Sequence, residues 1–266
     1  MKNELDLVSI KDRVVELTRS VGQFMRTEFE AFSKETIEYK GTNDMVSYVD
    51  KEAERLLVKG LTKILPEAGF LTEEETVARD TNKELIWIID PLDGTTNFVH
   101  GIPVFSTSVA LVKGSEVLIG VVNEVVREET FHAAKGFGAY LNDKSISVSA
   151  VSEMKNGLFA TGFPYHDFER LENFKAIMTD VLLGSHGLRR IGSAAVDLVY
   201  TACGRVEGFF ESGLNPWDIA GGVLIVQEAG GTVSDYRGGK DYLFGREVLA
   251  ACGVHEELLG LIKRHW

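Results

Sequence analysis

The pattern of apolar and polar positions predicts two helices at the start of the chain. Apolar residues recur at helical spacing over Leu5–Phe32, which is typical of one long amphipathic helix. A second helix is expected from about Val49 to Leu65, because Pro66 cannot continue it. The segment between them, Lys40–Tyr48, has no clear period and is interpreted as irregular.

Strand patterns follow these helices. The run Leu85–Ile89 is short and apolar on both faces, as in a buried strand, and we expect Pro91 to end it. Two apolar runs, Ser106–Val112 and Val117–Asn123, flank a short polar turn and predict a hairpin. Another strand is expected over Phe131–Leu141. The first half is therefore predicted to contain a cluster of antiparallel strands.

The second half alternates between strand and helix patterns. We expect strands near 158–161, 188–191, 206–211 and 248–251, and helices near 168–183, 193–203, 217–229 and 256–264. This alternation indicates a layered α/β arrangement. We expect a single domain over residues 1–266, with approximate halves 1–147 and 148–266 that share one cleft.

Two carboxylates follow the Leu85–Ile89 run, at the position where α/β sheets place their ligands. Asp90 and Asp93 open into the turn made by Gly94 and Thr95. Carboxylates held this close repel each other unless positive charge lies between them, and a hard divalent cation is the natural solution. Gly94 lets the backbone approach a ligand, and the amides after it can hold an anion. Metal-dependent phosphate chemistry is one interpretation; an Asp-Pro turn followed by an Asp helix cap is the other.

The composition excludes several other classes. A formal charge of −12 argues against a nucleic-acid-binding surface, which needs a positive field. Cys203 and Cys252 lie in no metal-binding pattern and are expected to pack as small buried hydrophobic residues. The N-terminus lacks the apolar core of a signal peptide, and no apolar run approaches the length of a membrane span. We therefore expect a cytoplasmic protein that binds neither nucleic acid nor a membrane.

Three stretches of the chain together resemble the inositol monophosphatase family. They are the acidic segment Phe70–Glu75, the segment Leu85–Pro103, and Asn215–Gly222 with its continuation to Gly231, in the family's order and at about its spacing. The resemblance covers nearly the whole chain. It implies a layered α/β fold, the α-β-α-β-α sandwich of the inositol monophosphatase and fructose-1,6-bisphosphatase type. It also implies two to three Mg²⁺ ions per site, inhibition by lithium and a homodimer.

The resemblance also implies a set of metal ligands. In the family pattern, Glu73, Asp90 and the Leu92 carbonyl hold one Mg²⁺. Asp90, Asp93 and Asp218 hold a second ion, and a weaker third ion lies near Glu73. Paired metals of this kind activate water and stabilise the leaving oxygen. The residues alone also allow Asp218 to be a simple helix cap and the acidic run around Glu73 to be mostly a solvated face.

A catalytic group is implied in the same way. The resemblance puts Asp50 beside Thr95, so that the polarised hydroxyl and Glu73 orient the attacking water. The pairing is chemically sensible, because neither Thr95 nor Asp50 alone is a competent base for water at neutral pH. The alternative for Asp50 is an acid favoured by the dipole at the start of the second helix. Lys40 either supplies positive charge near the site or is a solvated surface lysine.

The implied substrate contacts come from several segments. Glu211, at the end of a predicted strand, would accept hydroxyl groups of a sugar or cyclitol. Ser193 and the backbone amide of Ala194 match a substrate-contacting turn of the family. The amides of Gly94 and Thr95 would hold phosphate oxygens. The full implied set is Asp93, Gly94, Thr95, Ser193, Ala194, Glu211 and Asp218.

We therefore expect a Mg²⁺-dependent phosphomonoesterase that hydrolyses inositol monophosphate and related polyol or sugar phosphates by attack of metal-activated water. The tract Thr96–Phe98 favours the inositol branch, whereas Asn215–Pro216 departs from animal relatives and leaves the fine substrate preference open. Fructose-1,6-bisphosphatase or NADP phosphatase activity is the alternative within the family. A bacterial regulatory protein that binds the transcription machinery is the alternative of another class.

Overall fold

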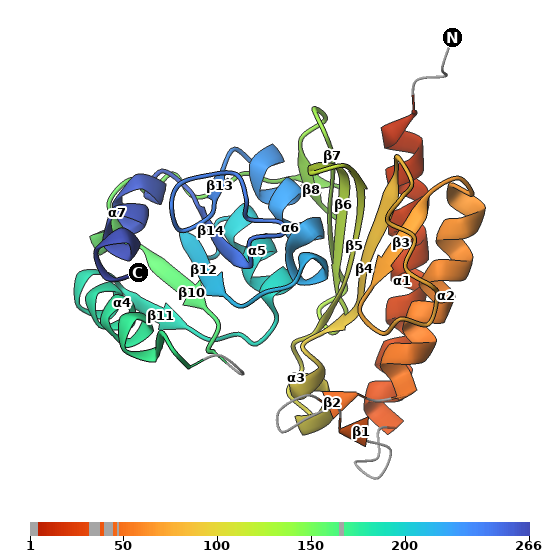
Figure 1. Cartoon of the computed structure of the whole chain (residues 1–266), viewed down its shortest axis with the longest axis horizontal. Coiled ribbons are helices and arrows are strands. Elements are labelled where there is room, and N and C mark those ends of the chain that lie inside the picture. Colours follow the sequence, from red (N-terminus) through yellow and green to blue (C-terminus); the bar gives the residue numbers. More distant parts are fainter. Residues whose placement is uncertain (1–4, 32–37, 40–44, 47, 165–167) are drawn as a thin grey trace.

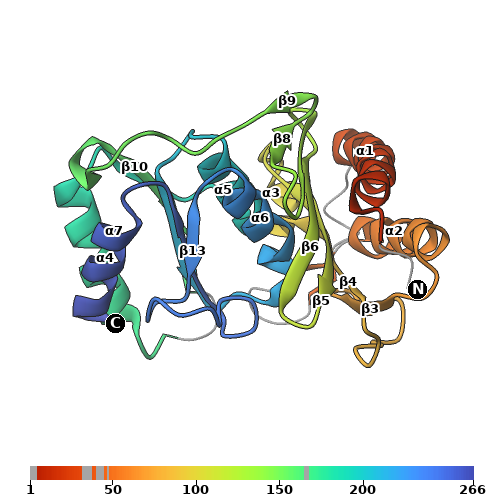
Figure 2. The same cartoon turned by 90° about the horizontal axis from the view of Figure 1, so that it is seen from above.

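The chain folds into five layers in which helices and sheets alternate (Figure 1). This computed structural model describes residues 5–31, 38–39, 45–46, 48–164 and 168–266. Seen from above, the layers are a helix pair, a large sheet, a central helix pair, a second sheet and an outer helix pair (Figure 2). This order confirms the predicted α-β-α-β-α sandwich.

The first two layers come from the first half of the sequence. Helices α1 (Leu7–Ala31) and α2 (Tyr48–Ile64) cover one face of a sheet in which β3 and β4 are parallel and the later neighbours antiparallel. The strands lie in the order β3 (Gly69–Thr72), β4 (Ile86–Asp93), β5 (Ser106–Lys113), β6 (Glu116–Glu124), β7 (Glu129–Ala134), β8 (Ala139–Leu141) and β9 (Lys144–Ser145). A short helix, α3 (Thr95–His100), follows β4.

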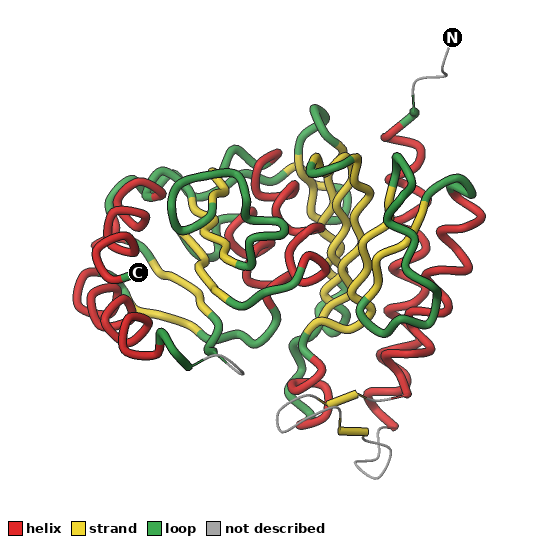
Figure 3. Tube along the Cα trace, in the orientation of Figure 1, coloured by secondary structure: helices red, strands yellow, loops and turns green. Residues whose placement is uncertain are grey.

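The remaining layers come from the second half of the sequence (Figure 1), and their helices and strands are drawn in red and yellow in Figure 3. The second sheet has the order β11 (Gly187–Arg189), β10 (Leu158–Thr161), β12 (Gly208–Ser212), β14 (Glu247–Ala251) and β13 (Thr232–Ser234). Helices α4 (Leu171–Gly184) and α7 (His255–His265) pack on its outer face, after a 3₁₀ turn at Met154–Asn156. Helices α5 (Ala194–Ala202) and α6 (Pro216–Glu228) lie between the two sheets.

Helix α6 is apolar around its whole circumference because both sheets surround it. Every residue of Ile219–Val226 is buried, which is expected of a helix without a solvent-facing side. The contact with β6 is close, since a Cβ atom on Gly120 would come within 2.3 Å of the Gly221 carbonyl oxygen. Glycine on both elements therefore lets the helix approach the sheet, and this packing fixes the direction of its first turn, which carries Asp218.

Two strand predictions are wrong for local reasons. Strand β4 passes through Pro91 and ends at Asp93, because its pairing with β5 is irregular after Asp90 and the missing proline N–H breaks no regular ladder bond. The expected strand Phe131–Leu141 is instead two antiparallel strands, β7 and β8. The turn between them contains Gly136 and Gly138 at φ of 83° and 76°, which a continuous strand does not allow.

Two further differences concern short segments. Strand β13 was not predicted, because its Thr-Val-Ser core is too short for a clear period. The segment expected to be irregular contains β2 (Met45–Val46), which pairs with β1 (Glu38–Tyr39), whereas Lys40 lies outside the described residues. In the described ranges, no helix is both long and apolar enough to cross a membrane.

The packing of α6 generates a prediction. Gly120→Ala should lower the free energy of unfolding by about 1–3 kcal/mol, because the new methyl group meets the Gly221 backbone and the helix must move away from β6. Urea unfolding measures the change. Gly260→Ala is the control, because a Cβ atom there meets nothing within 4 Å and alanine favours the helix. Equal stability of Gly120→Ala and the unmodified protein would contradict a tight contact.

Candidate active site

The two first acids of the site stand at the carboxyl ends of neighbouring parallel strands. Strands β3 and β4 are parallel, and Thr72 is paired with Ile89, so Glu73 and Asp90 are the next residues on each side. The Glu73 amide donates a hydrogen bond to the Ile89 carbonyl at 3.3 Å. Asp90 is only 1% exposed. The strand register therefore brings two carboxylates together, although they are distant in sequence.

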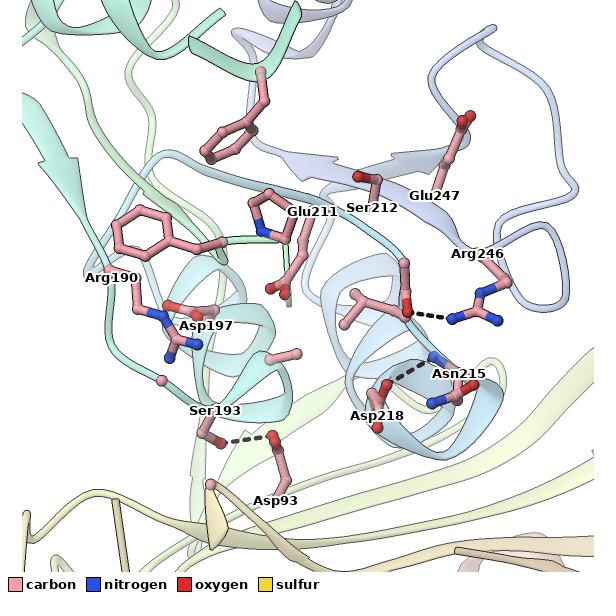
Figure 4. Close-up of a pocket in the computed structure, with 18 of the residues that line it drawn as sticks. Asp93, Arg190, Ser193, Asp197, Glu211, Ser212, Asn215, Asp218, Arg246 and Glu247 are labelled. Carbon is pink, nitrogen blue, oxygen red and sulfur yellow. Dashed lines mark hydrogen bonds between the residues drawn. The ribbon is translucent and has the colours of Figure 1, made fainter. Parts of the chain in front are cut away.

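The irregular end of β4 sets the positions of the side chains and carbonyl groups from Asp90 to Asp93. The Asp90 side chain accepts a hydrogen bond from the Leu92 amide at 3.0 Å, which closes a tight local turn. The Pro91 carbonyl accepts a hydrogen bond from the Thr107 hydroxyl at 3.0 Å. Asp93 then reaches the start of α5, where it accepts hydrogen bonds from the Ser193 hydroxyl at 2.6 Å and the Ala195 amide at 2.7 Å (Figure 4).

A glycine turn connects Asp93 to α3. Gly94 has φ 100° and ψ 31°, a left-handed conformation that favours glycine. A Cβ atom there would also come within 3.3 Å of the Gly192 carbonyl oxygen, in the turn before α5. Thr95 begins α3, and its hydroxyl donates a hydrogen bond to the Leu92 carbonyl at 3.0 Å.

The fourth acid lies in the first turn of α6. Asp218 accepts a hydrogen bond from the Asn215 amide at 2.7 Å, so one carboxylate oxygen caps the helix (Figure 4). Pro216 begins the helix, where its fixed φ is favourable and no amide is needed. The capping interpretation of Asp218 is therefore correct for one oxygen, and it leaves the second oxygen for another partner.

Burial sets the electrostatics of these acids. It raises the pKa of Glu73 and Asp90 well above their usual values, and repulsion from neighbouring carboxylates, Asp218 among them, adds to the rise. Burial also raises the pKa of Asp218 to about 7, with repulsion from Asp93. For Asp93 burial raises the pKa to about 6, although its bonds to Ser193 and Ala195 oppose the shift. Negative charge is thus costly throughout this cluster.

The donor chemistry of this cluster fits a hard divalent cation. Buried carboxylate oxygens and a backbone carbonyl are the ligands that Mg²⁺ and similar ions prefer. Across the described part of the chain, however, no group of three or more His, Cys, Asp or Glu side chains is arranged to hold a metal ion. Asp93 and Asp218 are turned to donors on α5 and α6 instead, and Glu73 and Asp90 share a hydrogen bond. The oxygen atoms and their charge therefore fit a divalent cation, but in this structure the side chains accept hydrogen bonds from protein groups.

The acids border a pocket of about 590 Å³ between the two sheets. Most of the predicted site residues line it: Glu73, Asp93, Gly94, Thr95, Ser193, Ala194, Glu211 and Asp218. Asp90 and Leu92 are buried in β4, with exposures of 1% and 0%. Asp50 is buried at the start of α2, and its charge raises the pKa of Glu73, which places the two acids near each other. The structure thus brings the predicted residues into one region.

Six charged residues that line the pocket were not predicted from the sequence: Glu169, Arg170, Arg190, Asp197, Arg246 and Glu247. In the view of Figure 4, Glu211 lies between Arg190 and Asp197 on one side and Asp218 on the other. Burial raises the pKa of Glu211 to about 8, and the charge of Arg190 opposes this shift. The one available signal was Asp197, a carboxylate within an otherwise apolar helix and four residues after Ser193.

The Glu211 carboxyl group can occupy its position because the residue next to it is a glycine, which has no side chain. A Cβ atom on Gly162 would come within 1.9 Å of the Glu211 carboxyl group, so a larger residue at 162 would displace the acid. Asp197 is 1% exposed, and its Oδ1 atom has no hydrogen-bond partner among the residues that the structure describes. Arg246 donates a hydrogen bond to the Gly213 carbonyl at 2.8 Å and holds the loop before α6 (Figure 4).

Comparisons with known proteins agree with this geometry. The model of the inositol monophosphatase family matches residues 6–266. An inositol-1-monophosphatase of Mesorhizobium japonicum is 37% identical over 92% of this chain and 92% of its own, and the Nus factor SuhB of Escherichia coli is 38% identical over 94% and 97%. A crystal structure of the extragenic suppressor protein suhB from Bartonella henselae superimposes with a TM-score of 0.90 at 34% identity, covering 97% of this chain and 100% of that one. The chain therefore belongs to the inositol monophosphatase family.

Proposed function

We propose that the protein is a Mg²⁺-dependent phosphomonoesterase that hydrolyses inositol monophosphate and related polyol or sugar phosphates. The observation that carries this proposal is the gathering of Glu73, Asp90, Asp93 and Asp218 beside a polar pocket that the N-terminus of α5 also borders. Acids suit a divalent cation, and the helix N-terminus suits an anionic phosphate. Membership of a phosphatase family agrees with this pairing.

The proposed ligands are divided between two ions. Glu73, Asp90 and the Leu92 carbonyl would hold one Mg²⁺, and Asp90, Asp93 and Asp218 would hold a second, with a weaker third ion near Glu73. Bound Mg²⁺ would supply an acidified water and neutralise the charge of the phosphate. For this, Asp93 and Asp218 must share their carboxylates between the ions and the donors that they contact.

The protein's own groups would orient the substrate. Gly94 and Thr95 line the pocket at a tight turn, and their amides would donate to phosphate oxygens. Ser193 and the Ala194 amide at the start of α5 would position the ester. Glu211 would accept substrate hydroxyls, because its buried carboxylate lines the pocket.

The attacking water would be oriented by three side chains. Asp50 is buried and Glu73 is half-buried, and the two acids are close enough for their charges to interact. Thr95 lines the same pocket as Glu73. The Thr95 hydroxyl donates to the Leu92 carbonyl in this structure, so in the proposed reaction its oxygen would accept a hydrogen bond from the water while keeping that bond. Such positioning is worth about 10²–10⁴-fold in rate when a group acts on the transferred proton.

A panel of phosphate esters tests the proposal. Inositol 1-phosphate, fructose 1,6-bisphosphate, NADP and 4-nitrophenyl phosphate should be assayed with Mg²⁺ and after chelation. We expect hydrolysis only with Mg²⁺ and the highest kcat/KM for inositol 1-phosphate. A preference for fructose 1,6-bisphosphate or NADP would keep the chemistry and move the substrate to the alternative within the family. Absence of Mg²⁺-dependent release of phosphate from all four would contradict the proposal.

A second candidate function is suggested by the names of relatives. The Escherichia coli and Vibrio cholerae relatives, 38% and 39% identical to this chain, are named Nus factor SuhB. An interaction with the transcription machinery is therefore the alternative role for this protein. Retention of bacterial RNA polymerase or its elongation factors by the purified protein would support it. A homodimer stays a prediction, which sedimentation equilibrium would test.

Asp93→Asn should leave the fold intact and greatly reduce activity. The asparagine carbonyl can still accept the hydrogen bonds from Ser193 and Ala195, but the negative charge is lost. We expect kcat/KM to fall about 1000-fold, corresponding to roughly 4 kcal/mol of transition-state stabilisation. Asp235→Asn is the control, because that acid accepts backbone hydrogen bonds in a distant turn and should retain activity. Near-normal turnover in folded, Mg²⁺-saturated Asp93→Asn would refute the metal site.

Thr95→Ala should lower kcat by about 100-fold and leave Mg²⁺ and substrate binding nearly unchanged, because water orientation alone is lost. The measurement is kcat and KM over a titration of Mg²⁺. The Thr95 hydroxyl also donates a hydrogen bond to the Leu92 carbonyl, a proposed Mg²⁺ ligand, so its loss could instead weaken metal binding. If the variant chiefly needs more Mg²⁺, the hydroxyl positions the Leu92 carbonyl, and the proposed catalytic role is wrong.

Glu211→Gln should change selectivity among esters. The amide is isosteric and still fits over Gly162, but it accepts hydroxyl donors less strongly than a carboxylate. We expect a loss in kcat/KM of roughly 10–100-fold for inositol 1-phosphate, which is the range of a hydrogen bond to a charged group. Hydrolysis of 4-nitrophenyl phosphate should be little affected. A uniform loss across all substrates would place Glu211 in the catalytic group instead.

A further inference from the structure

A buried carboxylate outside the pocket holds the loop that carries Glu73. Glu54 lies on α2 and is 0% exposed. Its Oε1 atom accepts hydrogen bonds from the Thr72 hydroxyl at 3.0 Å, the Thr76 amide at 2.7 Å and the Thr76 hydroxyl at 2.7 Å. Its Oε2 atom accepts a hydrogen bond from the Glu74 amide at 2.7 Å. One side chain thus receives four donors from a single short segment.

These donors lie on both sides of Glu73 in sequence. Thr72 precedes Glu73 as the last residue of β3, and Glu74 follows it directly. Between the Glu74 and Thr76 amides, Glu75 has φ 53°, a left-handed conformation that is unfavourable for a residue with a side chain. The backbone reversal at Glu75 is therefore held by amides that converge on one carboxylate.

Helix α2 supplies a fixed base for this carboxylate. Glu54 stands four residues after Asp50, so both acids project from the same face of the helix. Leu57 and Leu61 of the same helix are 0% exposed and anchor it in the core under the first sheet. One helix therefore carries Asp50, whose charge acts on Glu73, and Glu54, which binds the loop around Glu73.

We propose that Glu54 is a positioning residue of the reaction, which fixes the 72–76 loop so that Glu73 meets the metal and the attacking water in one orientation. The largest effects of neighbouring charges on Glu73 come from Asp218 and Asp50, whereas Glu54 acts through hydrogen bonds to the loop backbone and hydroxyls. The inference rests on the proposed metal-dependent phosphatase. Partners of this kind behind a metal ligand typically contribute about 10–100-fold to metal affinity or activity.

Glu54→Gln is the matched variant. The glutamine carbonyl can replace Oε1 and accept from Thr72 and Thr76, whereas its NH₂ group cannot accept from the Glu74 amide. The change removes one hydrogen bond beside Glu73 and preserves the shape of the side chain. We expect the Mg²⁺ dissociation constant, measured by calorimetry without substrate, to rise about 10–100-fold. Hydrogen exchange at the Glu74 amide should also become faster.

Leu61→Ala controls for a general loss of stability. It removes packing from the same helix and none of the loop's hydrogen bonds to Glu54, so the unfolding temperature should fall while Mg²⁺ affinity stays the same. If Glu54→Gln does not fold, the double variant Thr72→Val/Thr76→Val removes two hydroxyl donors and keeps the carboxylate. That variant should bind Mg²⁺ several-fold more weakly and retain the backbone bonds to Glu54.

The outcomes separate the two proposals. A folded Glu54→Gln variant, or the double variant in its place, that binds Mg²⁺ as the unmodified protein does would overturn the role of Glu54 and leave the phosphatase proposal intact. An equal loss of Mg²⁺ affinity in Leu61→Ala would reduce Glu54 to a structural group and overturn positioning. If the unmodified protein neither binds Mg²⁺ nor hydrolyses any phosphate ester, the proposed function is wrong and the positioning role falls with it.

Discussion

Mutual repulsion between buried carboxylates is the constraint on which the rest of this structure depends. Moving a charge out of water costs several kcal/mol, even after the protein relaxes, unless hydrogen bonds and opposite charge compensate it. Here burial raises the cost of a charge on Glu73 and on Asp90, Asp218 adds to that cost for both acids, and Glu73 adds to it for Asp90. The surrounding elements are arranged to supply donors to these acids, and the remaining cost is what a bound cation would offset.

Each donor comes from the end of a secondary-structure element. The start of α5 supplies the Ala195 amide and Ser193 hydroxyl to Asp93, and the residue before α6 supplies its amide to Asp218. Helix N-termini suit this role, because their first amides have no partner within the helix and carry partial positive charge. Helix α2 shows the reverse arrangement, because there a side chain of the helix, Glu54, accepts hydrogen bonds from the amides of a loop. The alternation of layers thus places helix ends from both halves of the chain around the end of β4.

The sequence predicted those parts of the site that are local or belong to a long motif. Asp90 and Asp93 could be found because an apolar run ends at them, and the layered fold followed from the alternation of the second half. Glu73 could not be separated from its acidic neighbours by pattern, since its role depends on the parallel register of β3 with β4. Arg190 and Asp197 were missed because they join the pocket only when α5 packs between the sheets. Glu54 was missed for a related reason: in sequence it is one more acid on an amphipathic helix, and four contacts to a distant loop give it its importance.

The wrong prediction for the end of β4, like the correct predictions, depends on local backbone hydrogen bonding. A proline was expected to end β4, but that rule concerns the loss of a ladder hydrogen bond, and the irregular pairing after Asp90 leaves no such bond to lose. The same irregular stretch contains the local turn in which the Leu92 amide donates to the Asp90 side chain.

A cluster of repelling carboxylates lowers the stability of the fold, so the surrounding core must supply the free energy that offsets this cost. Without a cation, the repulsion between these acids lowers the stability of the fold. A ligand that binds only the native state contributes about 2.7 kcal/mol to stability when its concentration is a hundred times its Kd. The protein without metal must therefore draw its stability from elsewhere. The apolar packing of α6 against both sheets meets this need, and it does so beside the site, since the helix whose first turn carries Asp218 continues as the buried segment Ile219–Val226 between the sheets. Asp218 and the close contact of Gly221 with Gly120 consequently lie within one turn of the same helix.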